Sequence, residues 1–295
     1  MDWANGFIAA DWGTTNRRAY LLGPDGSLQD EMEDGKGILS VPAGGFPEAV
    51  AELRSRLGDR PMLLAGMIGS NRGWVEAPYV AAPAGGEDIA RKLIWPEPGR
   101  TAIVPGVSYA DGDAADVMRG EEVQIVGAAA GGLVPTDCLL CHPGTHNKWV
   151  ELRGGKIIAF RTVMTGEIFN LLKNNSILAD LLGTPAAPDK PFAAGARHGL
   201  AEDDLTAELF SVRARVLLGS RPREEAASYI SGLLIGSDVR IGMRMRSQEE
   251  IIVMGRPELT GLYATALAVA GCSAREVDGE QAFLTGVRHL AEHAA

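Results

Sequence analysis

A turn near the N-terminus carries residues that could bind a phosphate group and a metal ion. The stretch FIAADWGTTNRRAYLL, residues 7–22, predicts a β-hairpin whose first strand ends at Asp11 and whose turn contains Gly13, Thr14 and Thr15. Glycine lets backbone N–H groups approach an anion, threonine adds hydroxyl donors, and aspartate can hold Mg²⁺ or its water. The pattern indicates a phosphate-and-metal turn, and an ordinary hairpin with a Gly-Thr turn is the competing interpretation.

The length and composition of the chain exclude several classes of protein. The chain has 295 residues, 46% of them hydrophobic, which is enough for two domains or one large one. Its net charge of −10 argues against nucleic-acid binding, which needs clustered Lys and Arg. No basic region followed by a long apolar segment is present, and the three cysteines are an odd number. We therefore expect a cytoplasmic protein without a disulfide framework and without membrane contact.

The elements of the first half must position the turn. After a third strand at 26–31, the pattern predicts a helix at 46–57, buried strands at 62–65 and 101–104, and a helix at 121–130. The Gly- and Pro-rich stretch at 70–86 predicts a loop, and residues 107–119 are polar and irregular.

The second half repeats this plan. Predicted strands cover 138–141, 149–152, 156–163, 251–254 and 275–277. Predicted helices cover 166–183, 201–218, 222–246, 259–270 and 281–293. Each half opens with a hairpin that contains a Gly-Thr turn, so the chain is expected to be an architectural duplication with domains at 1–132 and 133–295. The final helix, 281–293, is expected to pack back toward the boundary between the two domains.

Two such halves resemble the sugar kinase, Hsp70 and actin superfamily. DWGTTNRR is similar to its first phosphate hairpin, HPGTHNKW to its second, and IIVMGRPELTGLYATAL to the segment that borders adenosine. This resemblance implies an α/β fold with two ribonuclease-H-like domains and an ATP cleft between them. The helices that begin near residues 121 and 281 match its interdomain helices.

Six ordered stretches narrow the resemblance to one family. They resemble the 2-dehydro-3-deoxygalactonokinase family, which phosphorylates the terminal 6-hydroxyl of 2-dehydro-3-deoxy-D-galactonate in galactonate catabolism. The similarity runs from about residue 8 to residue 289. The stretches are DWGTTNRRAYL, AGMIGSNRGWVEAPY, MRGEEVQIVGA, PGTHNKWVEL, FRTVMTGEIFNLL and SGLLIGSDV.

The resemblance assigns residues to ATP and Mg²⁺. It implies that Asp11 coordinates the metal, and that phosphate groups contact the two Gly-Thr turns. The phosphate-binding residues are then Gly13, Thr14, Thr15, Gly144 and Thr145. The second turn departs from the superfamily pattern, because His142 stands where an aspartate is common, and this places more of the metal binding on Asp11.

Other residues border the nucleotide in this interpretation. Lys148 is a candidate for neutralising the transferred phosphoryl group or for binding the acceptor. Gly255 follows an apolar strand and allows close approach of the nucleoside, with Arg256 and Pro257 beside it, although a helix cap also explains this glycine. Glu167 is either a first-turn acid or a residue that shapes the cleft.

The general base is expected at the start of the helix at 121–130. In related sugar kinases an acid near this position points at the acceptor hydroxyl, and here Glu121 and Glu122 follow Arg119-Gly120. Successive helical residues point about 100° apart, so only one carboxylate can face the acceptor. Glu121 is preferred, Glu122 is second, and Asp11 is a lesser alternative. Both glutamates could instead be simple first-turn acids.

The loop SNRGW at 70–74 is the candidate acceptor site. Arg72 could pair with the substrate carboxylate, Asn71 could bond hydroxyls, and Trp74 could lie along the sugar's apolar face. Arg119 is a further cationic candidate. Each of these residues could equally serve the surface or the packing.

Several other motifs carry less weight. CLLCH at 138–142 has the pattern of haem attachment, and with His146 it suggests zinc, but strand geometry puts successive side chains on opposite faces. No P-loop or G-x-G-x-x-G motif follows a strand. Three arginines at 240–246 predict a solvated helix end. Homo-oligomer formation stays open.

The leading interpretation is an ATP-dependent sugar-acid kinase. One rival is a kinase for another sugar or sugar acid, because specificity depends on a few loop contacts. A rival of another class is a non-catalytic ATP-binding switch. The acids at 121–122 and the polar loop at 70–74 favour the enzyme, because a switch needs no sugar pocket.

Overall fold

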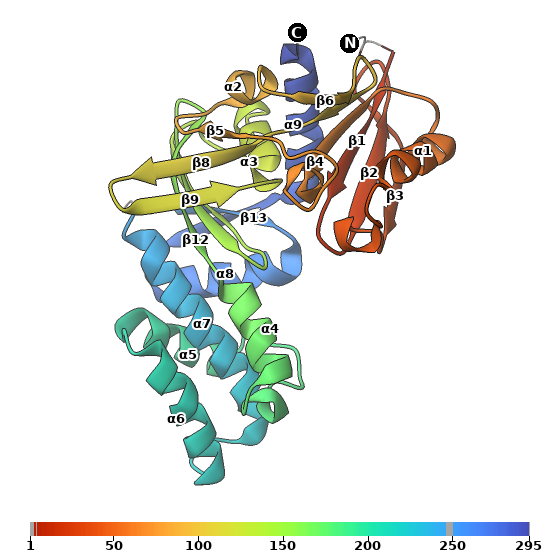
Figure 1. Ribbon diagram of the computed structural model, residues 1–295. Coiled ribbons are helices and arrows are strands. Elements are labelled where there is room, and N and C mark those ends of the chain that lie inside the picture. The colour runs from red at the N-terminus through yellow and green to blue at the C-terminus, as the bar shows by residue number, and fades with distance from the viewer. Residues whose placement is uncertain (1–2, 4, 246–249, 295) are drawn as a thin grey trace. The chain divides into compact units, whose positions relative to one another are not determined.

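A computed structural model describes residues 3, 5–245 and 250–294 (Figure 1). The chain divides into two compact units. Unit 1 comprises Met1–Thr136, Arg153–Ala159 and Glu280–Ala295, and unit 2 comprises Asp137–Leu152 and Phe160–Gly279. The domain division expected at 132/133 stays a prediction, and the compact units additionally place 153–159 and the last helix in unit 1.

The core of unit 1 is a six-stranded sheet with the order β3-β2-β1-β4-β7-β6. Its first three strands are an antiparallel meander, and β1 pairs in parallel with β4. The strands are β1 (Phe7–Trp12), β2 (Arg17–Leu22), β3 (Leu28–Asp34), β4 (Met62–Gly66), β6 (Ile94–Glu97) and β7 (Thr101–Ile103). Because β1 lies centrally, nearly all of its side chains are buried, which explains its continuous apolar run.

Helices of unit 1 cover this sheet, and one of them carries the two candidate acids, Glu121 and Glu122. The helix α1 (Phe46–Leu57) buries the apolar residues of its predicted face, including Val50 and Leu53. The helices α3 (Glu121–Ala130) and α9 (Gly279–His293) are in close contact, since a Cβ atom on Gly286 would lie 2.0 Å from the carbonyl oxygen of Val123. Two short helices also belong here, α2 (Gly86–Ala90) and the 3₁₀ turn η2 (Met67–Gly69).

Unit 2 repeats the strand order of unit 1. Its sheet runs β12-β11-β10-β13-β14, so the first three strands are again a meander and the first strand again pairs in parallel with the fourth. The strands are β10 (Cys138–His142), β11 (Asn147–Arg153), β12 (Lys156–Val163), β13 (Glu250–Gly255) and β14 (Ser273–Asp278). This shared order confirms the predicted α/β fold class and the architectural duplication.

A group of helices belongs to unit 2 (Figure 1). They are α4 (Thr165–Asn175), α5 (Lys190–Ala201), α6 (Leu205–Leu217), α7 (Ala226–Met243) and α8 (Pro257–Val269), with short 3₁₀ turns at η3 (Ala179–Leu181) and η4 (Arg223–Glu225). The helices α5 and α7 pack through glycines, because a Cβ on Gly195 or Gly199 would lie within 2.2 Å of a carbonyl oxygen of α7. Gly232 and Gly236 meet α5 in the same way.

Some sequence predictions were wrong. Residues 107–119 are not irregular, because β8 (Gly106–Asp111) and β9 (Ala114–Met118) form a hairpin that β5 (Tyr79–Ala81) extends from within the predicted loop at 70–86. The predicted helix at 201–218 is confirmed as α6, which begins at Leu205, but the preceding helix α5 was not predicted. The predicted helix at 166–183 stops at Asn175. The predicted end of the helix at 222–246 lies outside the described residues.

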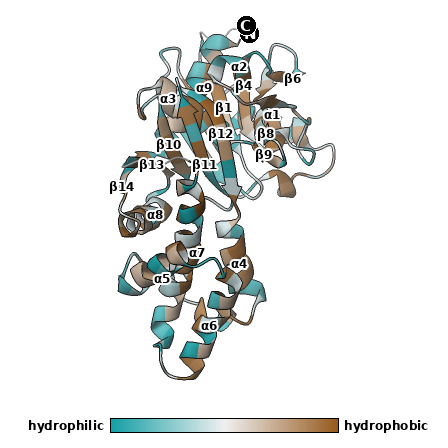
Figure 2. Cartoon of the chain, turned by 90° about the vertical axis from the view of Figure 1, so that its left-hand side faces the viewer, coloured by the Kyte–Doolittle hydropathy of each residue, from teal (hydrophilic) through white to brown (hydrophobic). Residues whose placement is uncertain are grey.

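The buried apolar residues form separate clusters in the two units. One cluster in unit 1 contains Ile8, Trp12, Leu53 and Leu64, and one in unit 2 contains Leu139, Trp149 and Val253. In Figure 2, stretches of the strands, for example around β1, are brown, the hydrophobic end of its scale. Among the described helices none has the length and apolar character needed to cross a bilayer.

Candidate functional site

The first Gly-Thr turn, between β1 and β2, is held by the segment that follows β3. Its three carbonyl groups accept hydrogen bonds from successive N–H groups at the start of η1 (Ile38–Ser40): Ile38 to Gly13 (3.0 Å), Leu39 to Thr14 (3.2 Å) and Gly37 to Thr15 (2.9 Å). The Gly13 N–H is bonded to the Asn16 carbonyl at 2.9 Å. Within the described chain, the N–H groups of the two threonines have no backbone acceptor, so the turn presents them to solvent, as anion binding requires.

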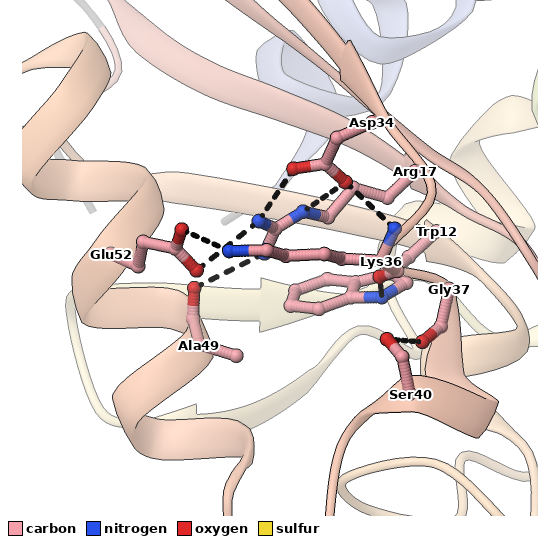
Figure 3. A network of polar contacts seen from close by, with 8 residues as sticks. All are labelled: Trp12, Arg17, Asp34, Lys36, Gly37, Ser40, Ala49 and Glu52. Atoms are coloured by element: carbon pink, nitrogen blue, oxygen red, sulfur yellow. Dashed lines mark hydrogen bonds and ion pairs between the residues drawn. The ribbon is translucent and has the colours of Figure 1, made fainter.

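A buried arginine anchors this arrangement (Figure 3). Arg17 forms a fork with the carboxylate of Asp34, with Nε–Oδ1 at 3.1 Å and Nη2–Oδ2 at 2.9 Å. It also contacts Glu52 at 3.3 Å and lies over the Trp12 ring, whose Nε1 donates to the Lys36 carbonyl at 3.0 Å. These contacts fix the ends of the strands beside the turn. Sequence reasoning missed them, because nothing in the local pattern marks Arg17 as buried.

Asp11 lies at the end of β1, beside the Gly66 backbone. A Cβ on Gly66 would be 3.1 Å from Oδ1 of Asp11. The carboxylate is half-buried, and no described residue donates a hydrogen bond to it. Burial and then the charge of Glu121 raise the pKa of Asp11 to about 6, while Arg18 acts in the opposite direction. A carboxylate with unused acceptor capacity and an unfavourable charge fits a divalent cation as its partner.

The helix α3 presents two acids in different environments. Glu122 is fully buried, and its Oε2 accepts a 2.6 Å hydrogen bond from the Gly120 N–H, while its Oε1 has no partner among the described residues. Burial and the charge of Glu121 raise the pKa of Glu122 to about 8. Glu121 is half-buried and accepts a 3.2 Å hydrogen bond from the Arg119 N–H. Only Glu121 therefore has a surface from which it can reach a substrate.

Arg119 lies beside these acids with part of its guanidinium unsatisfied. Its Nη2 donates to the Ala77 carbonyl at 2.7 Å, and its guanidinium carbon lies 4.5 Å from the centre of the Tyr79 ring. The Nε and Nη1 atoms are buried and have no hydrogen-bond partner in the described chain. A Cβ on Gly69 would be 2.9 Å from Nη1. The side chain is therefore held in place with two donors unused.

The predicted acceptor loop folds back onto the end of β4. The Trp74 N–H donates to the Ile68 carbonyl at 2.8 Å, and the Ala77 N–H donates to Gly69 at 2.9 Å. Ala77 thus links the loop to Arg119. Asn71 and Arg72 are exposed at the loop tip, and Trp74 is half-buried against the core. The sugar-binding roles of these residues stay predictions.

The second Gly-Thr turn, between β10 and β11, is held by the start of α4. The Glu167 N–H donates to the Thr145 carbonyl at 2.9 Å, and the Glu167 carboxylate lies 2.5 Å from Nε2 of His146. A Cβ on Gly166 would lie 2.4 Å from the Gly144 carbonyl oxygen. The helix and turn are therefore in direct backbone contact, as the first turn is with its own bracing segment.

Asp238 of α7 joins the elements around this turn. Its carboxylate accepts hydrogen bonds from the side chains of Asn147 (2.9 and 3.0 Å), Trp149 (2.7 Å), Thr165 (2.5 Å) and Tyr263 (2.5 Å). Burial raises the pKa of this carboxyl, and the hydrogen bonds act in the opposite direction. Sequence reasoning missed Asp238. The available signal was a single acid inside an otherwise apolar helix.

A cavity of about 260 Å³ opens beside the second turn. Apolar side chains from three helices line most of it, and Gly144, Thr165 and Gly166 belong to its wall. The other lining residues include Phe169, Lys173, Ser231, Leu234, Glu258, Leu259 and Leu262. A mainly apolar cavity with a few polar groups, next to a Gly-Thr turn, fits a nucleoside attached to phosphate.

The remaining predicted residues lie around this part of unit 2. Gly255 ends β13, and a Cβ there would be 3.7 Å from the Pro143 carbonyl oxygen. Lys148 is buried opposite His142 in the register of β10 and β11, on the sheet face away from Asn147 and Trp149. Neither Gly255 nor Lys148 lines the 260 Å³ cavity. Cys138 and Cys141 are both buried, and alternation along the strand puts them on opposite faces of β10.

Comparison with known proteins identifies the family. The family model described as 2-keto-3-deoxy-galactonokinase matches residues 11–290. The 2-dehydro-3-deoxygalactonokinase of Escherichia coli (strain K12) is 38% identical over 301 residues, which cover 98% of each chain. A Sinorhizobium meliloti protein whose crystal structure is described under that kinase name is 32% identical, with a TM-score of 0.90 over 97% of this chain and 98% of that one.

A more distant structure shares the fold alone. The (R)-2-hydroxyglutaryl-CoA dehydratase component A of Acidaminococcus fermentans is 10% identical, with a TM-score of 0.53 over 98% of this chain and 99% of that one. The family model and the E. coli relative both extend over nearly the whole chain. The chain therefore belongs to the 2-keto-3-deoxy-galactonokinase family.

Proposed function

We propose that this protein transfers the terminal phosphoryl group of ATP to the 6-hydroxyl of 2-dehydro-3-deoxy-D-galactonate, in galactonate catabolism. The observation that carries the proposal is Arg119, whose Nε and Nη1 are unused beside the two acids of α3. A sugar acid offers a carboxylate for that guanidinium and a hydroxyl for a neighbouring base. A non-catalytic ATP-binding switch would need neither.

Arg119 would bind the substrate carboxylate. Its guanidinium is positioned by the Ala77 carbonyl and the Tyr79 ring, so little side-chain freedom is lost on binding. Two buried donors without partners carry a desolvation cost that an anionic ligand would remove. Asn71, Arg72 and Trp74 would surround the rest of the acceptor.

Glu121 would accept the proton of the attacking hydroxyl. It is the acid of α3 with an accessible surface, whereas Glu122 is fully buried and accepts a hydrogen bond from the Gly120 N–H. It stands in the first turn of α3, and a positioned carboxylate can act as a general base. Glu122 would then be a positioning residue that fixes the backbone before Glu121.

Unit 2 would hold the nucleoside in the 260 Å³ cavity, and the two Gly-Thr turns would bind phosphate groups through N–H and hydroxyl donors. Gly255 would border the nucleoside from beside Pro143 of the cavity wall, and Lys148 would neutralise phosphoryl charge. Asp11 would hold Mg²⁺, which supplies charge neutralisation of the phosphates when bound. A cytoplasmic location is part of this proposal, because the donor is ATP.

A coupled assay of ADP release tests the proposal. Purified protein with Mg²⁺ and ATP is offered 2-dehydro-3-deoxy-D-galactonate, related keto-deoxy sugar acids and neutral hexoses. Rapid ADP release is expected with the galactonate derivative and not with the hexoses. Phosphorylation of neutral hexoses alone would refute the substrate, and ATP binding without any transfer would favour the switch.

A further inference from the structure

The last turn of α9 carries a group of metal-ligating side chains that the proposed kinase reaction does not use. His289 and His293 are four residues apart, so their rings lie on one face of the helix, with centroids 4.5 Å apart. Glu292 stands between them in sequence. One potential ligand atom from each of the three residues lies within 4.8 Å of the others.

A hydrogen bond orients the second imidazole for metal binding. Nδ1 of His293 lies 2.8 Å from the carbonyl oxygen of His289. A carbonyl only accepts, so this contact puts the proton on Nδ1 and leaves the lone pair on Nε2. The same arrangement orients histidines in metal sites, where the second ring nitrogen donates to a carbonyl or a carboxylate.

The other imidazole is held by packing on α2. A Cβ on Gly86 would lie 2.3 Å from Cδ2 and Nε2 of His289, so the ring rests directly on the glycine backbone. Both rings are half-buried and lose less freedom on coordination than exposed side chains would.

A fourth group approaches from α2. Oε1 of Glu87 lies 4.0 Å from Nε2 of His293. Figure 1 shows α2 beside the C-terminal part of α9. A cavity of about 320 Å³ lined by Glu87, Asp88 and His289, among others, leaves room for water ligands.

We propose that His289, Glu292 and His293 form a Zn²⁺ site, completed by Glu87 or water, that fastens the end of α9 to α2. Two imidazoles with one or two carboxylates match the ligand preference of Zn²⁺, whereas Mg²⁺ prefers oxygen ligands only. The site is separate from the acids of α3 and does not depend on the kinase proposal. The competing explanation is a helix end that uses its histidines only to cap carbonyl groups.

Calorimetric titration of metal-free protein with Zn²⁺ in excess Mg²⁺ tests the site. One Zn²⁺ per chain is expected for the wild type, with affinity at least about tenfold weaker in His293→Gln and in His289→Gln, and a smaller loss in Glu87→Gln. His198→Gln removes a histidine of unit 2 and should bind Zn²⁺ like the wild type. Because His289 packs on Gly86, the half-exposed His293 is the variant that keeps the test valid if His289→Gln fails to fold.

Thermal unfolding provides a second readout. Zn²⁺ should raise the unfolding temperature of the wild type and of His198→Gln, because a ligand of the folded state stabilises it, and should raise that of His293→Gln less at the same Zn²⁺ concentration. Absence of saturable binding by the wild type would overturn the proposal. Binding of unchanged affinity in both α9 variants would place the ion elsewhere, for instance at Cys272, and would overturn it as well.

Discussion

Gly37 lies so close to Thr14 that a Cβ atom on the glycine would stand 2.4 Å from the threonine carbonyl. The backbone of Gly37 is extended, with φ −64° and ψ 175°, so an alanine is disfavoured there by its contacts with the backbone of Thr14 and Thr15 and not by its dihedral angles. We expect Gly37→Ala to displace the first Gly-Thr turn and to lower kcat/KM for ATP on the order of 10²-fold. Gly35→Ala is the matched control, because no heavy atom lies within 4 Å of its added Cβ. Equal kinetics of the two variants would show that this turn does not bind phosphate.

Glu121→Gln should lower kcat by roughly 10²–10⁴-fold while the Kd for ATP stays near that of the wild type. The amide keeps the shape of the side chain and cannot accept the proton. Steady-state kinetics and equilibrium nucleotide binding separate the two effects. Glu122→Gln is the companion variant and should act mainly on stability. A large loss of kcat in Glu122→Gln with a normal Glu121→Gln would reverse the assignment of the base.

Arg119→Lys should raise KM for the sugar acid by about 10–100-fold and leave KM for ATP unchanged, since lysine keeps the charge but loses the fixed fork of donors. Arg72→Lys, at the exposed tip of the loop at 70–74, is the comparison variant, and Arg56→Lys, at an exposed position of α1, is the matched control. If Arg72→Lys carries the larger defect, carboxylate recognition belongs to the loop tip.

Asp238→Asn should destabilise the protein by roughly 2–4 kcal/mol, because an amide cannot accept all the donors now directed at the carboxylate. Denaturant unfolding measures the change. Asp180→Asn replaces an exposed aspartate of the same unit and should have little effect. KM for ATP should rise in Asp238→Asn, since Thr165 and Tyr263 also line the cavity. An unfolding free energy equal to that of the control would contradict the role of Asp238.

The raised pKa values of Asp11, about 6, and Glu122, about 8, predict that stability decreases as pH rises. Between their unfolded values near 4 and these folded values, the folded chain holds protons that the unfolded chain has released. The stabilising contribution is complete below about pH 4 and is lost as pH passes through the folded values. Each such proton contributes at most about 1.4 kcal/mol per pH unit.

Unfolding free energies measured between about pH 5 and pH 8 test this dependence. The upper part of the slope should flatten in Glu122→Gln, and Glu48→Gln, an exposed first-turn acid of α1, should keep it. Lower pH is avoided because ion pairs lower the pKa of Asp34 and Glu97, and these pairs weaken there. A wild-type stability that rises with pH over this range would refute the prediction.

The sequence alone predicted those strands, helices and turns that are determined by residues close together in the chain. Alternation and apolar runs predicted the strands around Asp11 and Cys138, and helical spacing predicted the helix that begins at Glu121. The two Gly-Thr turns, at matching places in two halves, pointed to the duplicated fold, and ordered motifs pointed to the family. These features are readable because burial periodicity and turn chemistry depend on residues that are neighbours in the chain.

Two elements were not predicted because their local sequence patterns are weak. The hairpin at 106–118 has too many polar residues to read as strands, and it is ordered by pairing with β5. The helix α5 depends on glycine contacts with α7, which no single segment reveals.

Only the tertiary structure decided which distant groups meet. Asp238 takes hydrogen bonds from residues 91, 89, 73 and 25 positions away in the sequence. The Gly37 N–H donates to the Thr15 carbonyl, although β2 and β3 lie between the two residues in the sequence. Arg119 donates to the carbonyl of Ala77, which is 42 positions away. Such partners are set by the order of strands in each sheet and by the burial that this order imposes. The same burial distinguishes Glu121 from Glu122, which are adjacent and chemically identical in the sequence.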